Sequence, residues 1–88
     1  MLGFGRSAGR QVEVFSREGC HLCEEVLATL ARYRRRHRLE ITVHDINSNP
    51  VWLENYHDKI PVVRIDGRDR FFGQVDEVLL RRVLDPGS

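Results

Sequence analysis

The sequence predicts one α/β domain built on a mixed four-stranded sheet with helices on both of its faces. Short runs rich in branched apolar residues alternate with helical periodicity, in the order strand, helix, strand, helix, strand, strand, helix. A helix joins the first two strands, which should therefore be parallel, whereas a tight turn joins the last two. Several strands contain adjacent apolar residues, as expected where both faces of a sheet are covered.

The first strand and the first helix have the clearest patterns. Residues 11–16 alternate Val12 and Val14 with polar side chains before an apolar end, which predicts a strand. From Leu22 the apolar positions recur at steps of three and four, which describes one stripe of a helix that ends near His37.

The middle of the chain predicts a strand, a short helix and another strand. Residues 39–46 are rich in branched side chains, and the turn cluster at 47–50 supplies a helix cap followed by a proline at the first helical position. We therefore expect a short helix over 51–57. Pro61 then opens a strand over 62–65, where a proline is tolerated at the first position.

The last third of the domain predicts a hairpin and a closing helix. The Asp-Gly pair at 66–67 is a turn signal, so residues 70–72 should form the returning strand. Asp76 is a suitable N-cap for a helix over 77–84, and the sequence Asp-Pro-Gly at 85–87 ends that helix.

Length and charge limit the domain organisation and the classes of partner. The chain of 88 residues has room for a flexible lead-in at 1–10, one domain at 11–85 and a tail at 86–88. A net charge of +1 gives no global field for nucleic acid or an anionic membrane. No apolar run could span a bilayer, and the first residues lack a secretory signal. We expect a cytoplasmic monomer that binds neither nucleic acid nor membrane.

Two cysteines lie where the first strand leads into the first helix. Cys20 and Cys23 are three residues apart, so both sulfurs should share one face at bridging distance. The unpaired N–H groups and the dipole of a helix N-terminus stabilise a thiolate, and free cysteine titrates near ~8.5 without such help. We therefore predict a redox pair in which Cys20 is the nucleophile and Cys23 resolves the mixed disulfide.

In this element order, the cysteine pair resembles the active site of the thioredoxin fold, and three local matches resemble the glutaredoxins within it. Arg17 stands three residues before Cys20, where the family has a lysine. Residues 59–61 are similar to the segment that ends in a cis-proline beside the cysteines. Residues 72–76 are similar to the glycine-rich turn and aspartate that bind the glutathione γ-glutamyl group. The resemblance covers about residues 11–84.

The resemblance implies a thioredoxin-like fold and a glutaredoxin-type thiol–disulfide oxidoreductase. Such an enzyme reduces protein or glutathione mixed disulfides by a dithiol mechanism, with glutathione as co-substrate, no other cofactor and no metal. Seven residues are then candidates for binding substrate or glutathione: Arg17, His21, Lys59, Ile60, Pro61, Gly73 and Asp76.

These candidates have different expected roles. Arg17 and Lys59 would hold a substrate carboxylate by charge-assisted hydrogen bonds. A cis Ile60–Pro61 bond would leave the Ile60 backbone free to pair with an extended substrate, although a trans proline that merely opens a strand is the alternative. Asp76 is first a helix cap, and its second role comes from the resemblance alone.

The chain also departs from the usual glutaredoxin pattern. His21 and Leu22 replace the proline and tyrosine between the cysteines, and Gln74 stands where a second glycine is usual. We hypothesise that a protonated His21 stabilises the Cys20 thiolate and tunes the redox potential. The alternative is an exposed histidine without a partner.

Other functions remain open on the sequence alone. The same fold could serve as a non-catalytic binding module for a peptide or for an iron–sulfur cluster bridging two chains, or as a structural subunit with incidental cysteines. Tetrahedral zinc would need four ligands, and the remaining histidines show no paired spacing.

Two further features have ordinary structural explanations. Five arginines lie within residues 32–38, either as a solvated helix end or as a docking site for an acidic partner or nucleic acid. Trp52 and Tyr56 fit packing better than a ligand platform.

Overall fold

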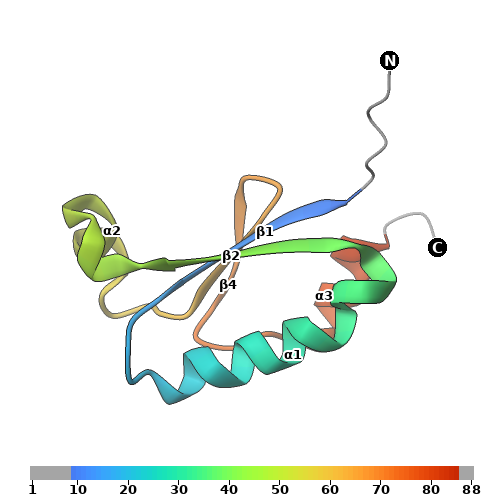
Figure 1. The fold of residues 1–88 in the computed structure, drawn as a ribbon, viewed down its shortest axis with the longest axis horizontal. Helices are drawn as coiled ribbons and strands as arrows, with labels where there is room; N and C mark the ends of the chain where they lie inside the picture. The colour runs from blue at the N-terminus through green and yellow to red at the C-terminus, as the bar shows by residue number, and fades with distance from the viewer. Residues whose placement is uncertain (1–8, 86–88) are drawn as a thin grey trace.

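The computed structural model describes residues 9–85 of the chain (Figure 1). Its elements are β1 (Arg10–Ser16), α1 (His21–His37), β2 (Leu39–Asp45), the 3-10 helix η2 (Ile46–Ser48), α2 (Pro50–Tyr56), β3 (Val62–Ile65), β4 (Arg68–Phe72) and α3 (Glu77–Leu84). The predicted tail at 86–88 and residues 1–8 of the predicted lead-in lie outside the described residues.

The four strands form one mixed sheet in the order β2-β1-β3-β4. β1 pairs parallel with β2, which makes α1 the crossover between them, and β3 pairs antiparallel with both β1 and β4. The predicted fold class and pairing directions are confirmed.

Several element boundaries differ from the prediction by one or two residues, α2 among them, which spans Pro50–Tyr56 and not 51–57. Side chains and neighbouring strands decide three of these boundaries. Arg10, assigned to the lead-in, is the first residue of β1, where its N–H donates to the Arg38 carbonyl at 3.2 Å. β2 ends at Asp45, whose side chain caps η2, so Ile46 leaves the strand. β4 begins at Arg68, two residues early, because this residue pairs with Ile65.

The main core lies between the sheet and the two longer helices. α1 and α3 lie together on one face of the sheet, and α2 lies at one end of the molecule (Figure 1). The buried side chains of this core are Val12, Val14, Val26, Leu30, Leu39, Val63, Ile65, Phe71, Leu80 and Leu84. This core fixes α1 against β1, and with it the position of the helix start.

A smaller core under α2 covers only the end of the opposite face. Phe15, Ile46, Tyr56 and Val62 are buried there, and Trp52 packs against them. The Phe15 ring lies 4.8 Å from the Tyr56 ring and 5.3 Å from the Trp52 ring, measured between centroids. The packing role predicted for Trp52 and Tyr56 is confirmed.

A hydrogen-bonded triad ties α2 to the hairpin. The Tyr56 hydroxyl donates to Asp69 at 2.9 Å and accepts from Arg64 at 2.9 Å, while Arg64 Nε donates to the other oxygen of Asp69 at 2.8 Å. Burial and the neighbouring Asp69 carboxylate raise the pKa of Tyr56 above its usual value. The triad steadies the connection between α2 and β3, which contains Pro61.

No helix among the described residues is long and apolar enough to cross a membrane.

Candidate functional site

Three segments that are distant in sequence meet at one end of the sheet. Phe15 pairs with Val62, so the loop that follows β1 lies beside the residues that precede β3. Val62 also pairs with Phe72, and the Gly73 N–H donates to the Pro61 carbonyl at 2.8 Å. The cysteine loop, the segment before β3 and the loop after β4 therefore form one site, which we call the cysteine end.

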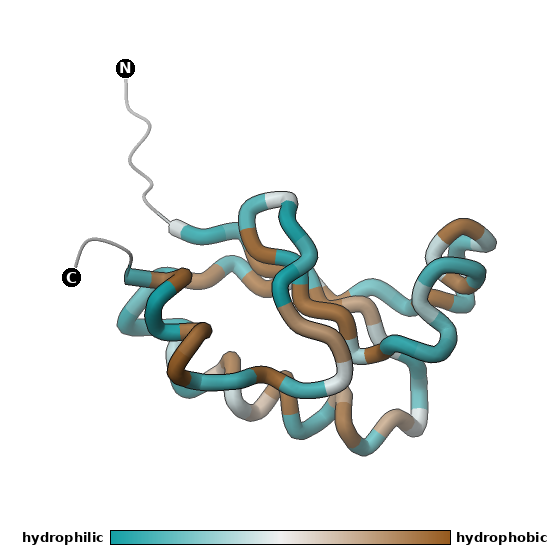
Figure 2. The backbone as a smooth tube through the Cα atoms, turned by 180° about the vertical axis from the view of Figure 1, so that it is seen from behind, coloured by the Kyte–Doolittle hydropathy of each residue, from teal (hydrophilic) through white to brown (hydrophobic). Residues whose placement is uncertain are grey.

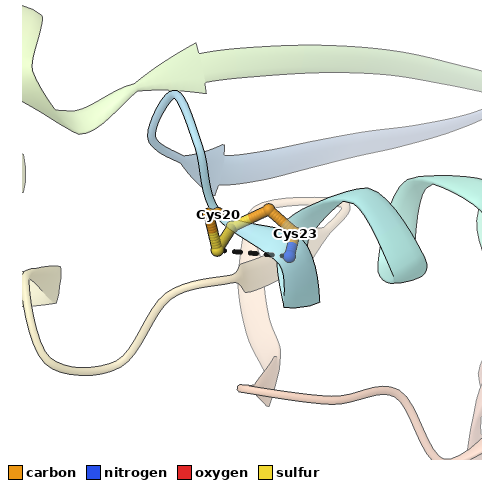
Figure 3. The surroundings of a disulfide bond; sticks show 2 residues. All are labelled: Cys20 and Cys23. Carbon is orange, nitrogen blue, oxygen red and sulfur yellow. Dashed lines mark hydrogen bonds between the residues drawn. A yellow bond between two sulfur atoms is a disulfide. The ribbon is translucent and has the colours of Figure 1, made fainter.

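The cysteine pair occupies the first turn of α1. Cys20 is the N-cap and Cys23 lies one turn along, with their Cα atoms 5.2 Å apart and their sulfurs joined in a disulfide (Figure 3). The Cys20 Sγ also accepts the Cys23 N–H at 3.2 Å, which satisfies one of the free donors at the helix start (Figure 3). The predicted shared face and bridging distance are confirmed.

The two sulfurs differ in access. Cys23 has a residue exposure of 2% and belongs to the buried set, whereas Cys20 is partly exposed. Cys20 is therefore more accessible to an incoming disulfide than Cys23. The roles of Cys20 as nucleophile and Cys23 as resolving cysteine stay predictions.

A tight turn delivers Cys20 to the helix start. The Cys20 N–H donates to the Arg17 carbonyl at 3.2 Å, and Gly19 has φ +80, where a side chain would strain the backbone. The Arg17 side chain is exposed beside this turn. Its contact with a substrate carboxylate stays a prediction.

His21 has a partner that the sequence analysis did not foresee. Its Nε2 lies 3.0 Å from Glu25 Oε2, and both side chains are mainly exposed. The alternative of a histidine without a partner is therefore wrong. A protonated His21 would share its charge with the Glu25 carboxylate as well as with a thiolate at Cys20, so its tuning role stays a prediction.

The segment before β3 has the backbone form that the resemblance implied. The Ile60–Pro61 bond is cis, Pro61 is buried, and Ile60 packs against the smaller core. Lys59, in contrast, is turned back onto the end of α2, where Nζ donates to the Asn55 carbonyl at 3.2 Å and lies 3.5 Å from Asp58. It would have to leave these partners to hold a substrate carboxylate.

The loop after β4 supplies a second helix start to the site. Gly73 has φ +84, and Asp76 caps α3 by accepting the Val78 N–H at 2.9 Å and the Leu79 N–H at 3.3 Å. The predicted cap is confirmed. Both bonds go to Oδ1, and no residue between 9 and 85 donates to Oδ2, so this oxygen can accept a ligand ammonium group.

A shallow hollow beside the cysteines was missed in the sequence. It measures about 230 Å³ and lies between the first turns of α1, at Leu22 and Glu25, and the loop at 73–75. Leu22 is 49% exposed, so the hollow offers an apolar surface close to Cys20. The sequence could not indicate it because its walls are about 50 residues apart.

The part of the chain that the structure describes contains no group of three or more His, Cys, Asp or Glu side chains that could hold a metal ion.

Comparison with known proteins places this site in a family. The model of the family described as Glutaredoxin-like domain (DUF836) matches residues 11–85. Uncharacterized protein Rv0508 of Mycobacterium tuberculosis is 33% identical over 76 residues, covering 81% of this chain and 78% of its own. Uncharacterized protein Mb0520 of Mycobacterium bovis matches equally well.

Solved structures of other proteins share the fold of the domain. Protein Ne2328 from Nitrosomonas europaea superposes with a TM-score of 0.78 and 29% identity, covering 86% of this chain and 92% of its own. Protein XcR50 from X. campestris superposes with a TM-score of 0.71 and 26% identity, covering 88% of this chain and 99% of its own. The T8A mutant of the thioredoxin-like protein BC3987 superposes with a TM-score of 0.54 and 19% identity, covering 84% of this chain and 94% of its own. At this identity the similarity shows the thioredoxin-like fold alone.

Proposed function

Because this chain belongs to the glutaredoxin-like domain family, we propose that it is a thiol–disulfide oxidoreductase that reduces protein or glutathione mixed disulfides by a dithiol mechanism. One observation carries the proposal: a reachable sulfur caps a helix, and a second, buried sulfur lies within bonding distance of it. This is the arrangement that two successive thiol exchanges require.

The first exchange begins at Cys20. Its thiolate attacks one sulfur of a substrate disulfide, so a Cys20–substrate bond forms while the substrate's own S–S bond breaks. The leaving sulfur keeps the electron pair and takes a proton from solvent. The Cys23 N–H that points at the Cys20 Sγ, together with the positive end of the helix dipole, favours the negative charge on this sulfur.

The second exchange uses Cys23. Its sulfur attacks the Cys20 sulfur, the Cys20–substrate bond breaks, and the thiol proton of Cys23 passes to the departing substrate sulfur. Two electrons have then moved from the dithiol to the substrate, which leaves as two thiols. The product is the Cys20–Cys23 disulfide present in this structure.

Glutathione is the co-substrate that we propose for resetting the pair. Two glutathione thiols would supply the two electrons and leave as one glutathione disulfide. The free Oδ2 of Asp76 and the open backbone at Gly73, where no atom beyond the neighbouring residues Phe72 and Gln74 lies within 4 Å of an added Cβ, support binding of the γ-glutamyl group. Gln74 is exposed and lines the adjoining hollow, where its side chain lies beside this space.

Trapping with Cys23→Ser tests the proposal. This variant can perform the first exchange but not the second, so incubation with a glutathionylated peptide should leave a stable adduct on Cys20 that mass spectrometry locates. The matched variant Cys20→Ser should form no adduct, since Cys23 is buried.

A second measurement separates an enzyme from a binding module. The alkylation rate of reduced Cys20 across pH should show a thiol that ionises more readily than cysteine in a free peptide. Ordinary ionisation together with no adduct on the Cys23→Ser variant would overturn the proposed activity, and peptide or cluster binding without exchange would support the binding module instead.

A further inference from the structure

A second hollow lies at the end of the sheet opposite the cysteines. It measures about 600 Å³, which is within the range of small-molecule sites, and it lies between the β3–β4 hairpin and the second half of α3. Its wall includes Arg10, the first residue of β1, six positions before the strand ends at Ser16. At about 3.3 Å per residue, the two sites are roughly 20 Å apart along the strand.

The floor of this hollow is apolar. Ile65 and Phe71 are buried members of the main core, and Leu79 and Val83 of α3 form the facing wall. Leu79 is 47% exposed, an unusual position for a leucine that borders the core. Figure 2 shows a hydrophilic turn between the two hairpin strands, with hydrophobic stretches in the strands and in α3. The floor can therefore take the apolar body of a ligand.

The rim of the hollow carries an excess of positive charge. The lining residues include four arginines and one carboxylate, that of Asp66. The arginines are Arg10, Arg68, Arg70 and Arg82. We call this hollow the arginine pocket.

The one carboxylate is already satisfied. Asp66 Oδ2 accepts from Arg10 at 2.9 Å, and Oδ1 accepts the Gln11 N–H at 3.0 Å. The side chains of Arg68 and Arg82 have no hydrogen-bonded or ion-paired partner between residues 9 and 85. Their donors are therefore available to an anion from outside.

A β-bulge contributes the additional arginine. Arg64 pairs with Asp69 and Val63 pairs with Phe71, so Arg70 is an extra residue in β4 without a partner in β3. A bulge bends its strand and changes where side chains point. Here it brings a further positive charge to the rim, since Arg70 acts on Asp66 electrostatically.

We propose that the arginine pocket binds an organic anion in which an apolar body carries a phosphate or carboxylate head. The guanidinium groups of Arg68 and Arg82 would bind the head, because a planar guanidinium group can donate two parallel hydrogen bonds to a phosphate or a carboxylate. Leu79 and the buried floor would cover the body. The arginines that end α1 adjoin this end of the sheet, since Arg38 bonds Arg10, and their charge raises the local concentration of anions.

Titration of the full-length protein with simple probes tests this site. AMP is a probe with a phosphate head and a ring system, and octanoate is a probe with a carboxylate head and an acyl chain. Inorganic phosphate has the anionic head without a body. Backbone amide shifts in NMR spectra should move saturably at Leu79 and in the β3–β4 hairpin for AMP or octanoate, and much less for phosphate at the same concentration. Which of the first two binds tells a nucleotide-like source from an acyl source.

Matched variants assign the binding to the pocket. Arg68→Gln and Arg82→Gln should each weaken it about tenfold, as expected for the loss of a charge-assisted hydrogen bond. Arg35→Gln, at the end of α1 outside the pocket, should change it less than twofold. Leu79→Asn should weaken the binding about fivefold. Val78→Asn, at the exposed position next to Leu79 and outside the pocket, should not weaken it.

The outcomes separate this proposal from the proposed redox activity. Failure of both AMP and octanoate to saturate, or equal weakening by Arg35→Gln and Arg68→Gln, would overturn the pocket. Disulfide exchange at Cys20 would be unaffected by that result, because the two ends of the sheet share no residue.

Discussion

The two ends of the sheet differ in what fixes their geometry. At the cysteine end, the backbone does so: Gly19 and Gly73 have positive φ, the Ile60–Pro61 bond is cis, and Cys23 is buried. At the arginine end the hairpin also has special backbone, with positive φ at Asp66 and Gly67 and a bulge at Arg70, but the groups that would face a ligand are long, mostly exposed side chains around an apolar floor. A site for chemistry needs fixed atoms, whereas a site for recognising charge can be built from long, adaptable side chains.

The largest expected effect is on exchange activity. Cys20→Ser should lower the rate of mixed-disulfide reduction about a thousandfold or more, because a hydroxyl at this position cannot replace the thiolate nucleophile. Arg68→Gln should leave that rate within twofold. A coupled glutathione assay measures both. A large loss of this rate in Arg68→Gln would show that the two ends act together, contrary to the separation described above.

An intermediate effect is expected on stability at the cysteine end. Asp76→Ala removes the cap that holds two backbone N–H groups of α3 and should lower the free energy of unfolding by about 1 kcal/mol. Asp76→Asn keeps an oxygen at the cap and should lose less. Urea denaturation monitored by circular dichroism measures the difference.

The same pair of variants tests whether Asp76 also binds glutathione. Asp76→Asn retains the cap but loses the charge, so it should raise the KM for glutathione while stability stays near that of the natural chain. An unchanged KM would leave Asp76 as a helix cap only.

The smallest effect is electrostatic and lies at the arginine end. The hydrogen bond from Arg10 lowers the pKa of Asp66, despite partial burial, which acts to raise it. Since the folded-state pKa is lowered, the stability that Asp66 contributes is present above its ordinary value of 3.8 and is lost as pH falls through the folded-state value. Arg10→Gln should move this pKa upward, which a carboxyl NMR titration measures.

The contribution of this pair to stability should be small. Asp66 has a side-chain exposure of 42%, and pairs of this kind contribute at most about 1 kcal/mol. If Arg10→Gln lowered stability by several kcal/mol, the arginine end would be structurally as rigid as the cysteine end.

Local patterns were enough to predict the strands, the α-helices and the position of the cysteine pair, but not the 3-10 helix η2. Cys20 and Cys23 are three residues apart and Asp76 caps the helix that follows it, so their geometry depends on neighbours in sequence. The direction of Lys59 was not predictable in the same way. Its two local partners, Asn55 and Asp58, compete with a substrate, and only the folded end of α2 decides between them.

The sequence by itself determined the order of strands and helices, the pairing directions of the sheet and the place of the cysteine pair, since hydrophobic periodicity and capping act over a few residues. Only the tertiary structure decided that Pro61 and Gly73 bond beside the cysteine loop, and that arginines from β1, β4 and α3 surround one hollow. The physical reason is that strand register and helix packing bring together side chains from distant parts of the chain. A one-residue bulge such as that at Arg70 changes which of them meet.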